Sequence, residues 1–294
     1  MFFRSTCHID YVENHTGGNK MQIHMKWWLA AAVGLAVVGL GATTANAATS
    51  SKYLTGNVGY VRTKKAMYVG IYKKTNGKYK QVKVKKNTLL NAESIMSMSD
   101  GHGGVKTTAL FTYGVVNYKR AKALKYKNIA TIPFTKANFR YVTLKAPIRT
   151  QVFLNGKGYT ANSTNMTAEP TPGFYLTLDN YLQYYSKAAM AKDSHLFGSR
   201  WADSTNVYKP TRSVKVSKVT VKGNTTKIDY NKALKGLPNK KLSKGHYRLT
   251  ITNKKTTGSL GINPTDDTFD AIASWTNYTV NGKAYHFGEV ENGN

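Results

Sequence analysis

The chain has 294 residues with 43 Lys and Arg against 14 Asp and Glu, which gives a formal net charge of +29 at pH 7. The 20 Tyr and 10 Phe exclude wholesale disorder, because disordered chains are poor in aromatic residues. The length suffices for one large domain or a few small ones, and the single cysteine excludes a disulfide framework within the chain.

Residues 21–47 read as a secretory signal peptide. A positive residue and the apolar run Trp27–Ala42 are followed by Ala45-Asn46-Ala47, the small residues that a signal peptidase inspects. The run is shorter than the about 20 residues that a membrane-spanning helix needs. We therefore predict cleavage after Ala47 and a secreted or cell-surface location, with an uncleaved membrane anchor as the alternative. Because Cys7 precedes the signal, the exported chain would contain no Cys nucleophile.

Residues 1–20 precede this signal and show no periodicity. The stretch Thr16–Met21 can be encoded by a purine-rich sequence like that of a bacterial ribosome-binding site. We therefore predict that translation starts at Met21, so that residues 1–20 are either untranslated or a disordered extension of the leader.

A basic β-module is predicted for residues 48–136, after a flexible start at Ala48–Gly59. Strand signals cover Tyr60–Tyr72, and the following Asn76-Gly77 pair favours a type I′ hairpin. The next stretch, Tyr79–Lys85, alternates apolar and basic residues, which predicts a strand that packs one face and presents lysines on the other.

The rest of this module is predicted to hold a turn, a strand and a helix. The turn cluster is Asp100–Gly104, and a strand follows over Thr107–Val116. The stretch Tyr118–Tyr126 is predicted to form a short basic helix, with a solvated connecting segment as the alternative.

A second β-module with a helical segment is predicted for residues 137–206. Its stretch Tyr141–Phe153 is similar to Tyr60–Tyr72, and Asn-Gly-Lys follows both, so we interpret the pair as a weak internal repeat of tandem modules. Chance similarity between two strands rich in Lys and Tyr is the alternative. The helix is predicted over Thr177–Lys192, with Thr177 as its cap.

A third, C-terminal module rich in β-strands is predicted for residues 207–294. Strands are expected at Val207–Val221 and His246–Thr252, a capped helix at Thr265–Trp275, and a hairpin at Tyr278–Phe287. Together the patterns predict a mainly β fold with short helices, all-β or α+β, built from small antiparallel sheets or SH3-like modules in tandem.

The excess of positive charge predicts a polyanionic partner, since so many like charges repel one another without one. A solvated surface that favours solubility is the alternative. An exported protein meets anionic cell-wall polymers of the teichoic-acid kind more readily than nucleic acid, and lysine suits tolerant attraction to a flexible polymer. The predicted polyanion-binding residues are Lys80, Lys83, Lys85, Lys86, Lys119, Arg120, Lys122 and Lys125.

The stretch Leu144–Lys157, which reads LKAPIRTQVFLNGK, resembles the S-layer-associated domains of lactobacillal cell-surface proteins. The predicted leader, the lack of Cys after it and the high pI are also similar to exported proteins of these Gram-positive bacteria. The resemblance implies basic, Tyr-rich β-modules that attach a protein non-covalently to wall polymers. It supplies no individual site residue.

The sequence predicts no catalytic site, metal site or cofactor. No HExxH or other close histidine pair is present, and the run Asp193-Ser194-His195 is interpreted as a loop because adjacency in sequence is not triad geometry. The acids Asp266, Asp267 and Asp270 fail the EF-hand spacing and are explained as part of the helix cap.

Two other classes of function stay open. A wall-modifying enzyme would be indicated by a deep pocket lined by two carboxylates, or by His195 with an acid. An adhesin would bind host matrix or other extracellular polyanions, including nucleic acid. In the non-catalytic wall-binding protein that we predict first, exposed Tyr or Trp201 could contact surface glycans.

Overall fold

The computed structural model describes residues 52–54, 59–99, 105–127, 132–144, 149–162, 167–192, 208–262 and 271–292. In these ranges the fold is mainly β with two very short helices and antiparallel sheets, which confirms the predicted fold class. None of the helices within the described ranges is long and apolar enough to cross a membrane. The predicted features that lie outside these ranges are the leader segments 1–20 and 21–47, the turn cluster Asp100–Gly104, the run Asp193-Ser194-His195, Trp201 and the acids Asp266, Asp267 and Asp270.

One sheet of the first half of the chain has the order β5-β4-β1-β7. It packs on a core in which the rings of Phe111 and Phe139 stack at 4.6 Å and Phe134 tilts against both. Leu54 is buried in the same core and donates its backbone N–H to the carbonyl of Phe134, so this part of the predicted flexible start is held in place. The strands are β1 (Tyr60–Thr63), β4 (Leu89–Ser99), β5 (Val105–Thr112) and β7 (Phe139–Tyr141).

A second sheet has the order β3-β2-β6 and consists of β2 (Met67–Thr75), β3 (Lys78–Val84) and β6 (Leu124–Tyr126). The predicted hairpin is confirmed, since Asn76 and Gly77 join β2 to β3 with φ values of 50° and 78°, both positive as a type I′ turn requires. The register shifts between Tyr68 and Tyr72, which marks a bulge in β2, and Val69 and Ile71, two residues apart, are both buried on the inward face.

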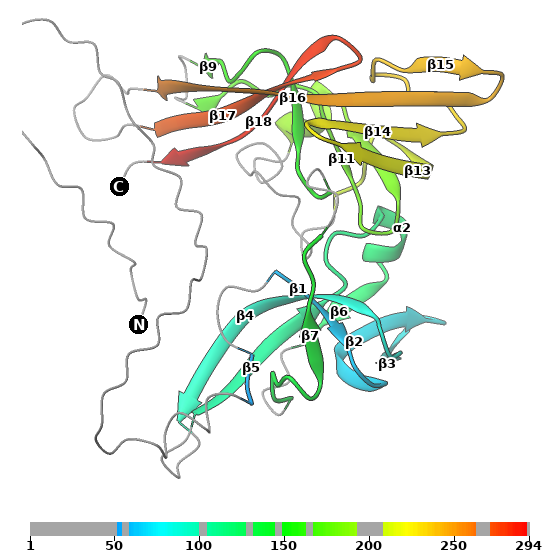
Figure 1. Ribbon diagram of the computed structural model, residues 1–294, viewed down its shortest axis with the longest axis vertical. Coiled ribbons are helices and arrows are strands. Elements are labelled where there is room, and N and C mark those ends of the chain that lie inside the picture. The colour runs from blue at the N-terminus through cyan, green and yellow to red at the C-terminus, as the bar shows by residue number, and fades with distance from the viewer. Residues whose placement is uncertain are drawn as a thin grey trace, which may run out of the picture. The chain divides into compact units, whose positions relative to one another are not determined.

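The largest sheet has nine strands in the order β14-β13-β12-β11-β8-β18-β17-β16-β15. Because β14 also pairs with β16, the sheet closes on itself, and its enclosed core is dominated by aromatic and aliphatic side chains such as Phe153, Phe174 and Tyr285. Figure 1 shows β16 as a long strand with β17 and β18 beside it. The strands are β8 (Phe153–Asn155), β11 (Gly173–Leu176), β12 (Tyr181–Tyr185), β13 (Arg212–Lys222), β14 (Thr225–Tyr230), β15 (Lys240–Ser243), β16 (His246–Ile262), β17 (Ala271–Val280) and β18 (Lys283–Asn292), with β9 (Ala161–Asn162) and β10 (Thr167–Ala168) as a separate pair.

The strands expected near Val207–Val221 and His246–Thr252 are confirmed as β13 and β16, and the expected hairpin is confirmed as β17–β18. Several strand ends differ from the prediction, and β13 starts only at Arg212. The strand expected over Thr107–Val116 ends at Thr112, because Gly114 takes a positive φ of 64° and turns the chain. Conversely, β16 runs ten residues further than expected, to Ile262, since it pairs with β17 along its second half.

The basic helix expected over Tyr118–Tyr126 is wrong beyond its first turn. The helix α2 (Tyr118–Ala121) begins after the cap Asn117, whose side chain accepts from the N–H of Arg120. The chain then forms β6, because Leu124 and Tyr126 pack against the core and pair with β2.

The helix expected over Thr177–Lys192 is also wrong for most of its length. Thr177 does act as a cap, but in a tight turn between β11 and β12, where its Oγ1 accepts from the N–H of Tyr181. The strand β12 is buried on both faces, so it lacks the alternation that marks a half-buried strand. Only α3 (Lys187–Ala191), capped by Ser186, is helical.

The helix expected over Thr265–Trp275 is wrong in its described part, since Ala271–Trp275 belong to β17. The proposed repeat is not reflected in the strands either. The starts of the two similar stretches pair with each other in one sheet, where Val61 lies opposite Tyr141. Of the two Asn-Gly pairs that follow these stretches, Asn76-Gly77 forms a two-residue hairpin and Asn155-Gly156 does not. The predicted segment 137–206 thus gives β7 to the first sheet and β8, β11 and β12 to the largest.

Candidate polyanion-binding surfaces

The outward side of the β3-β2-β6 sheet carries tyrosines and lysines in register, and we call it the lysine–tyrosine face. Tyr68 lies opposite Lys83, and Tyr72 lies opposite Lys125. The inward side carries Val69, Ile71, Val82 and Val84, which belong to the core or pack against it. The face consists of Tyr68, Tyr72, Lys74, Tyr79, Lys83, Lys125 and Lys127.

Three ammonium groups on this face lie over tyrosine rings. The Nζ atoms of Lys125, Lys127 and Lys83 lie 4.5, 5.2 and 6.0 Å from the ring centroids of Tyr79, Tyr72 and Tyr68, respectively. Such a contact contributes about 0.5–1 kcal/mol at an exposed site, so it orients the ammonium group without neutralising it. Among the described residues, no carboxylate forms an ion pair with these lysines. The face therefore presents orientated positive charge together with exposed aromatic rings.

The inward side of the same sheet leads to a hollow of about 540 Å³, which we call the basic hollow. Three cationic side chains line it, from β2 and from α2, and two tyrosines contribute ring surface, one before α2 and one from β12. The lining residues are Lys73, Val82, Tyr113, Asn117, Lys119, Arg120, Ala123, Leu124 and Tyr181.

Arg120 is held at the hollow by two neighbours. Its guanidinium carbon lies 4.3 Å from the ring centroid of Tyr113, and its Nη1 lies 3.9 Å from Oδ2 of Asp179. Asp179 also accepts from the backbone N–H of Asn117 at 2.9 Å and from the hydroxyl of Thr177 at 2.7 Å. The carboxylate is therefore shared among several donors, and Arg120 is the most distant of them.

The structure divides the predicted residues between these places. Lys83 and Lys125 lie on the lysine–tyrosine face, whereas Lys119 and Arg120 line the basic hollow. Lys80 lies opposite Lys73, on the inward side. The other three predicted residues are exposed next to these places: Lys85 and Lys86 directly follow β3, and Lys122 caps α2, with its Nζ 5.6 Å from the ring of Tyr118.

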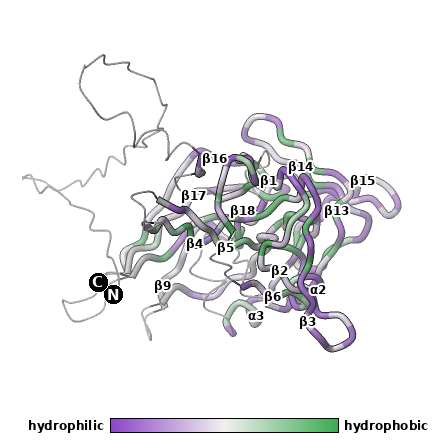
Figure 2. Tube along the Cα trace, turned by 90° about the horizontal axis from the view of Figure 1, so that it is seen from below, coloured by the Kyte–Doolittle hydropathy of each residue, from purple (hydrophilic) through white to green (hydrophobic). Residues whose placement is uncertain are grey.

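A second basic surface on the largest sheet was not predicted, and we call it the lysine–threonine face. Lys218, Asp229 and Arg248 lie opposite one another across β13, β14 and β16, and Arg248 donates two hydrogen bonds to Asp229, at 2.6 and 2.9 Å. This pair lowers the pKa of Asp229 below its usual range. The hydrophilic stretch along β13 is visible in Figure 2. The face consists of Lys218, Thr220, Lys222, Thr225, Lys227, Asp229, Lys240, Arg248, Thr250 and Thr252.

The signal for this face was present in the alternation of Val and Lys along residues 214–222. That alternation predicts a strand, but it does not group the lysines, because their neighbours across the sheet come from β14 and β16. Strand pairing, rather than proximity along the chain, brings Lys227 between Thr220 and Thr250.

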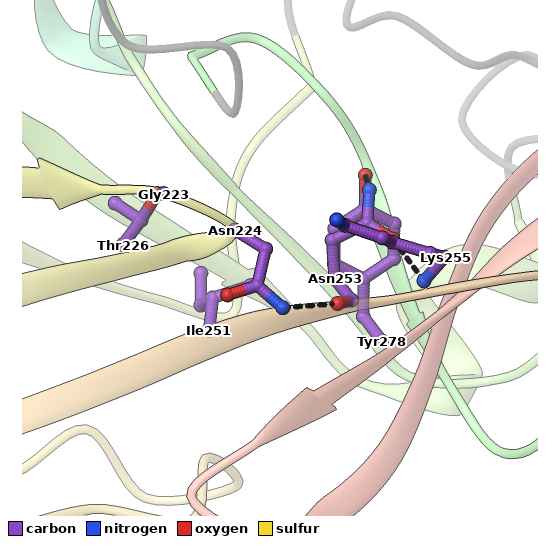
Figure 3. Close-up of a pocket in the computed structure, with 7 residues that line it drawn as sticks. All are labelled: Gly223, Asn224, Thr226, Ile251, Asn253, Lys255 and Tyr278. Carbon is purple, nitrogen blue, oxygen red and sulfur yellow. Dashed lines mark hydrogen bonds between the residues drawn. The ribbon is translucent and has the colours of Figure 1, made fainter.

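A hollow of about 360 Å³ opens beside the turn between β13 and β14, and Figure 3 shows its side chains. The side-chain amides of this hollow donate hydrogen bonds to other residues that line it. Nδ2 of Asn224 donates to the backbone carbonyl of Asn253 at 2.9 Å, and Nδ2 of Asn253 donates to the hydroxyl of Tyr278 at 3.2 Å. The N–H of Lys255 donates to the side-chain oxygen of Asn253 at 2.7 Å. No carboxylate or histidine is among the described residues that line this hollow or the basic hollow.

The described histidines do not form a metal centre. His246 is exposed at the start of β16, whereas His286 is buried between the rings of Tyr159 and Trp275. Burial lowers the pKa of His286 to about 4, and its Nδ1 lies 3.3 Å from the carbonyl oxygen of Gly156. No group of three His, Cys, Asp or Glu that could hold a metal is found in the part of the chain that the structure describes.

A scan of known family models and searches of curated proteins and of solved structures find no match to this chain.

Proposed function

We propose that this chain is an exported, non-catalytic cell-surface protein that associates non-covalently with anionic cell-wall polymers of the teichoic-acid type. The observation that carries the proposal is the lysine–tyrosine face, where Lys83, Lys125 and Lys127 lie over tyrosine rings. Ammonium groups attract the phosphates of such a polymer, and binding releases its counterions.

The mixture of lysine and tyrosine suits a polymer of phosphates and polyols or sugars. Tyrosine offers a flat apolar surface with a hydroxyl at its edge, against which the carbon skeleton between two phosphates can pack. Tyr68 is 50% exposed and Tyr79 is 36% exposed, so these rings are available for contact. Lysine ammonium groups follow phosphates at variable positions better than rigid guanidinium forks do.

Protection of sheet edges is the competing explanation of the lysines. β3 and β6 are the two edge strands of their sheet, and lysines at such edges prevent pairing with other chains. Edge protection requires charge but no ligand. The two explanations therefore differ in whether removal of these lysines weakens binding to walls.

The test measures binding of the purified protein to bacterial cell walls, with and without teichoic acid, over a series of salt concentrations. We expect binding that depends on teichoic acid and falls with salt. The triple variant Lys83→Gln, Lys125→Gln and Lys127→Gln should bind about tenfold or more weakly at 0.1 M salt, because three phosphate contacts are lost.

The matched control is the triple variant Lys192→Gln, Lys209→Gln and Lys283→Gln, which makes the same change of charge at exposed lysines away from the face. It should retain most of the binding. Equal losses in the two triple variants would show that net charge alone attracts the polymer, and binding that is insensitive to salt would contradict the proposal.

A further inference from the structure

We propose that the basic hollow is a binding site for a single phosphate ester group, with Tyr113 and Tyr181 as walls for the attached polyol. This inference rests on the proposed function, because it assigns one repeat unit of the polymer to a defined site. The site is separate from the lysine–tyrosine face, since Lys73 and Lys74 point to opposite sides of β2.

Two lysines of like charge lie opposite each other beside the hollow. Lys73 of β2 lies opposite Lys80 of β3, and the third residue of that row is Leu124 of β6. Like charges that lie opposite each other on one face of a sheet destabilise it. No carboxylate among the described residues pairs with Lys73 or Lys80, so an anion bound beside them would relieve this repulsion.

Cationic side chains from two different elements line the basic hollow. Lys119 and Arg120 of α2 line the same hollow as Lys73 of β2. The guanidinium group of Arg120 contacts the ring of Tyr113 and lies 3.9 Å from Asp179, which favours one orientation of the group without saturating its donors. A guanidinium group that keeps free donors can bind two oxygens of one phosphate side by side.

The size and lining of the hollow fit a phosphate ester. A volume of about 540 Å³ exceeds the needs of a bare ion and accommodates a phosphate with a short polyol. Val82, Ala123 and Leu124 add apolar surface to the lining of the hollow. This combination matches a phosphate ester better than inorganic phosphate, because the ester carries carbon next to its charge.

The experiment titrates the full-length protein with glycerol 1-phosphate and follows binding by calorimetry and by ³¹P line broadening. Inorganic phosphate and glycerol are titrated in parallel at constant ionic strength. We expect glycerol 1-phosphate to bind more tightly than inorganic phosphate, and glycerol to give no saturable signal. Equal affinity for the ester and for inorganic phosphate would overturn the role of the tyrosine walls.

The variants compare lysines inside and outside the hollow. Lys73→Gln and Arg120→Gln should each weaken glycerol 1-phosphate binding about fivefold or more, whereas Lys192→Gln, an exposed lysine outside the hollow and both basic faces, should change it by less than twofold. Arg120→Lys keeps the charge but lacks the planar guanidinium group that can bind two phosphate oxygens, so we expect a loss of affinity smaller than that of Arg120→Gln. Similar losses in Lys73→Gln and Lys192→Gln would contradict a defined site, as would the lack of saturable binding by the unchanged protein. Urea unfolding of each variant verifies that the fold is intact.

Failure of this inference is distinguishable from failure of the proposed function. If the protein binds teichoic-acid-containing walls but not glycerol 1-phosphate, the hollow is no phosphate site and the proposed function stands. If glycerol 1-phosphate binds at Lys73 and Arg120 but walls are not bound, the hollow serves a soluble phosphate ester and the proposed function fails.

Discussion

At the scale of single residues, His286 makes stability depend on pH. Its side chain is fully buried, and burial lowers its pKa from 6.5 to about 4. The unfolded chain binds a proton near pH 6.5, whereas the folded chain resists protonation until about pH 4. The contribution of the neutral imidazole to stability is therefore complete above pH 6.5 and is lost as the pH falls from 6.5 towards 4.

We predict that the free energy of unfolding falls by about 2 kcal/mol more between pH 7 and pH 4.5 in the unchanged protein than in His286→Gln. Glutamine can still donate to the carbonyl oxygen of Gly156, but it does not titrate. Urea unfolding at the two pH values measures the difference. If both proteins lose the same amount, titration of His286 does not contribute.

Gln183 joins the two halves of the chain at a buried position. Its Oε1 accepts from the N–H of Tyr118 at 2.7 Å, and its Nε2 donates to the hydroxyl of Tyr175, also at 2.7 Å. Gln183→Leu leaves both partners without this hydrogen bond, and we predict a loss of about 2–3 kcal/mol in the free energy of unfolding. Gln81→Leu, at an exposed position on β3, should change it by less than about 0.5 kcal/mol in the same urea experiment. Similar losses would show that burial of the amide is not the cause.

At the scale of elements, the hairpin between β17 and β18 depends on a glycine with positive φ. Gly282 has a φ of 82°, and a Cβ there would meet no atom within 4 Å, so a side chain would be opposed by backbone conformation alone. We predict that Gly282→Ala lowers the free energy of unfolding by about 1 kcal/mol. Gly261→Ala, in β16, also has open space but needs no positive φ, and it should be neutral or slightly stabilising. Thermal unfolding compares the two, and equal effects would contradict the argument.

These hairpins show which elements the sequence could predict. Asn76-Gly77 and Asn281-Gly282 are turns whose conformation depends on two residues, so local sequence was sufficient. The strand β12 could not be recognised, because Leu182 and Tyr184 face one core and Tyr185 faces another. Without alternation, the spacing of its apolar residues resembled that of a helix.

The candidate site was predictable only in part, for a related reason. The basic stretches around Lys83 and Lys125 were visible in the sequence. That Lys83 and Lys125 share one side of a sheet, with Lys80 on the other side, depends on the register among β2, β3 and β6. Lys73 was missed because its importance comes from Lys80 opposite it and from α2 beyond it. A pocket built from distant segments gives no local signal.

At the scale of the whole molecule, positive charge occupies two sheets rather than one. The lysine–tyrosine face lies on β3-β2-β6, and the lysine–threonine face lies on β13-β14-β16-β15. If both faces bind the proposed polymer, they act together, because binding at the first raises the effective concentration of polymer at the second. Strong binding to walls then requires no deep recognition site at either face.

The salt dependence of wall binding tests this two-face model. The triple variant Lys218→Gln, Lys222→Gln and Lys227→Gln removes charge from the lysine–threonine face and leaves the Arg248–Asp229 pair in place. If these lysines contact phosphates, the slope of log K against log salt should decrease by about 2, at roughly 0.7 per contact on a flexible single strand. Wall sedimentation over a salt series measures the slope. An unchanged slope would exclude the lysine–threonine face from binding, because a face that contacts phosphates must release counterions when it binds.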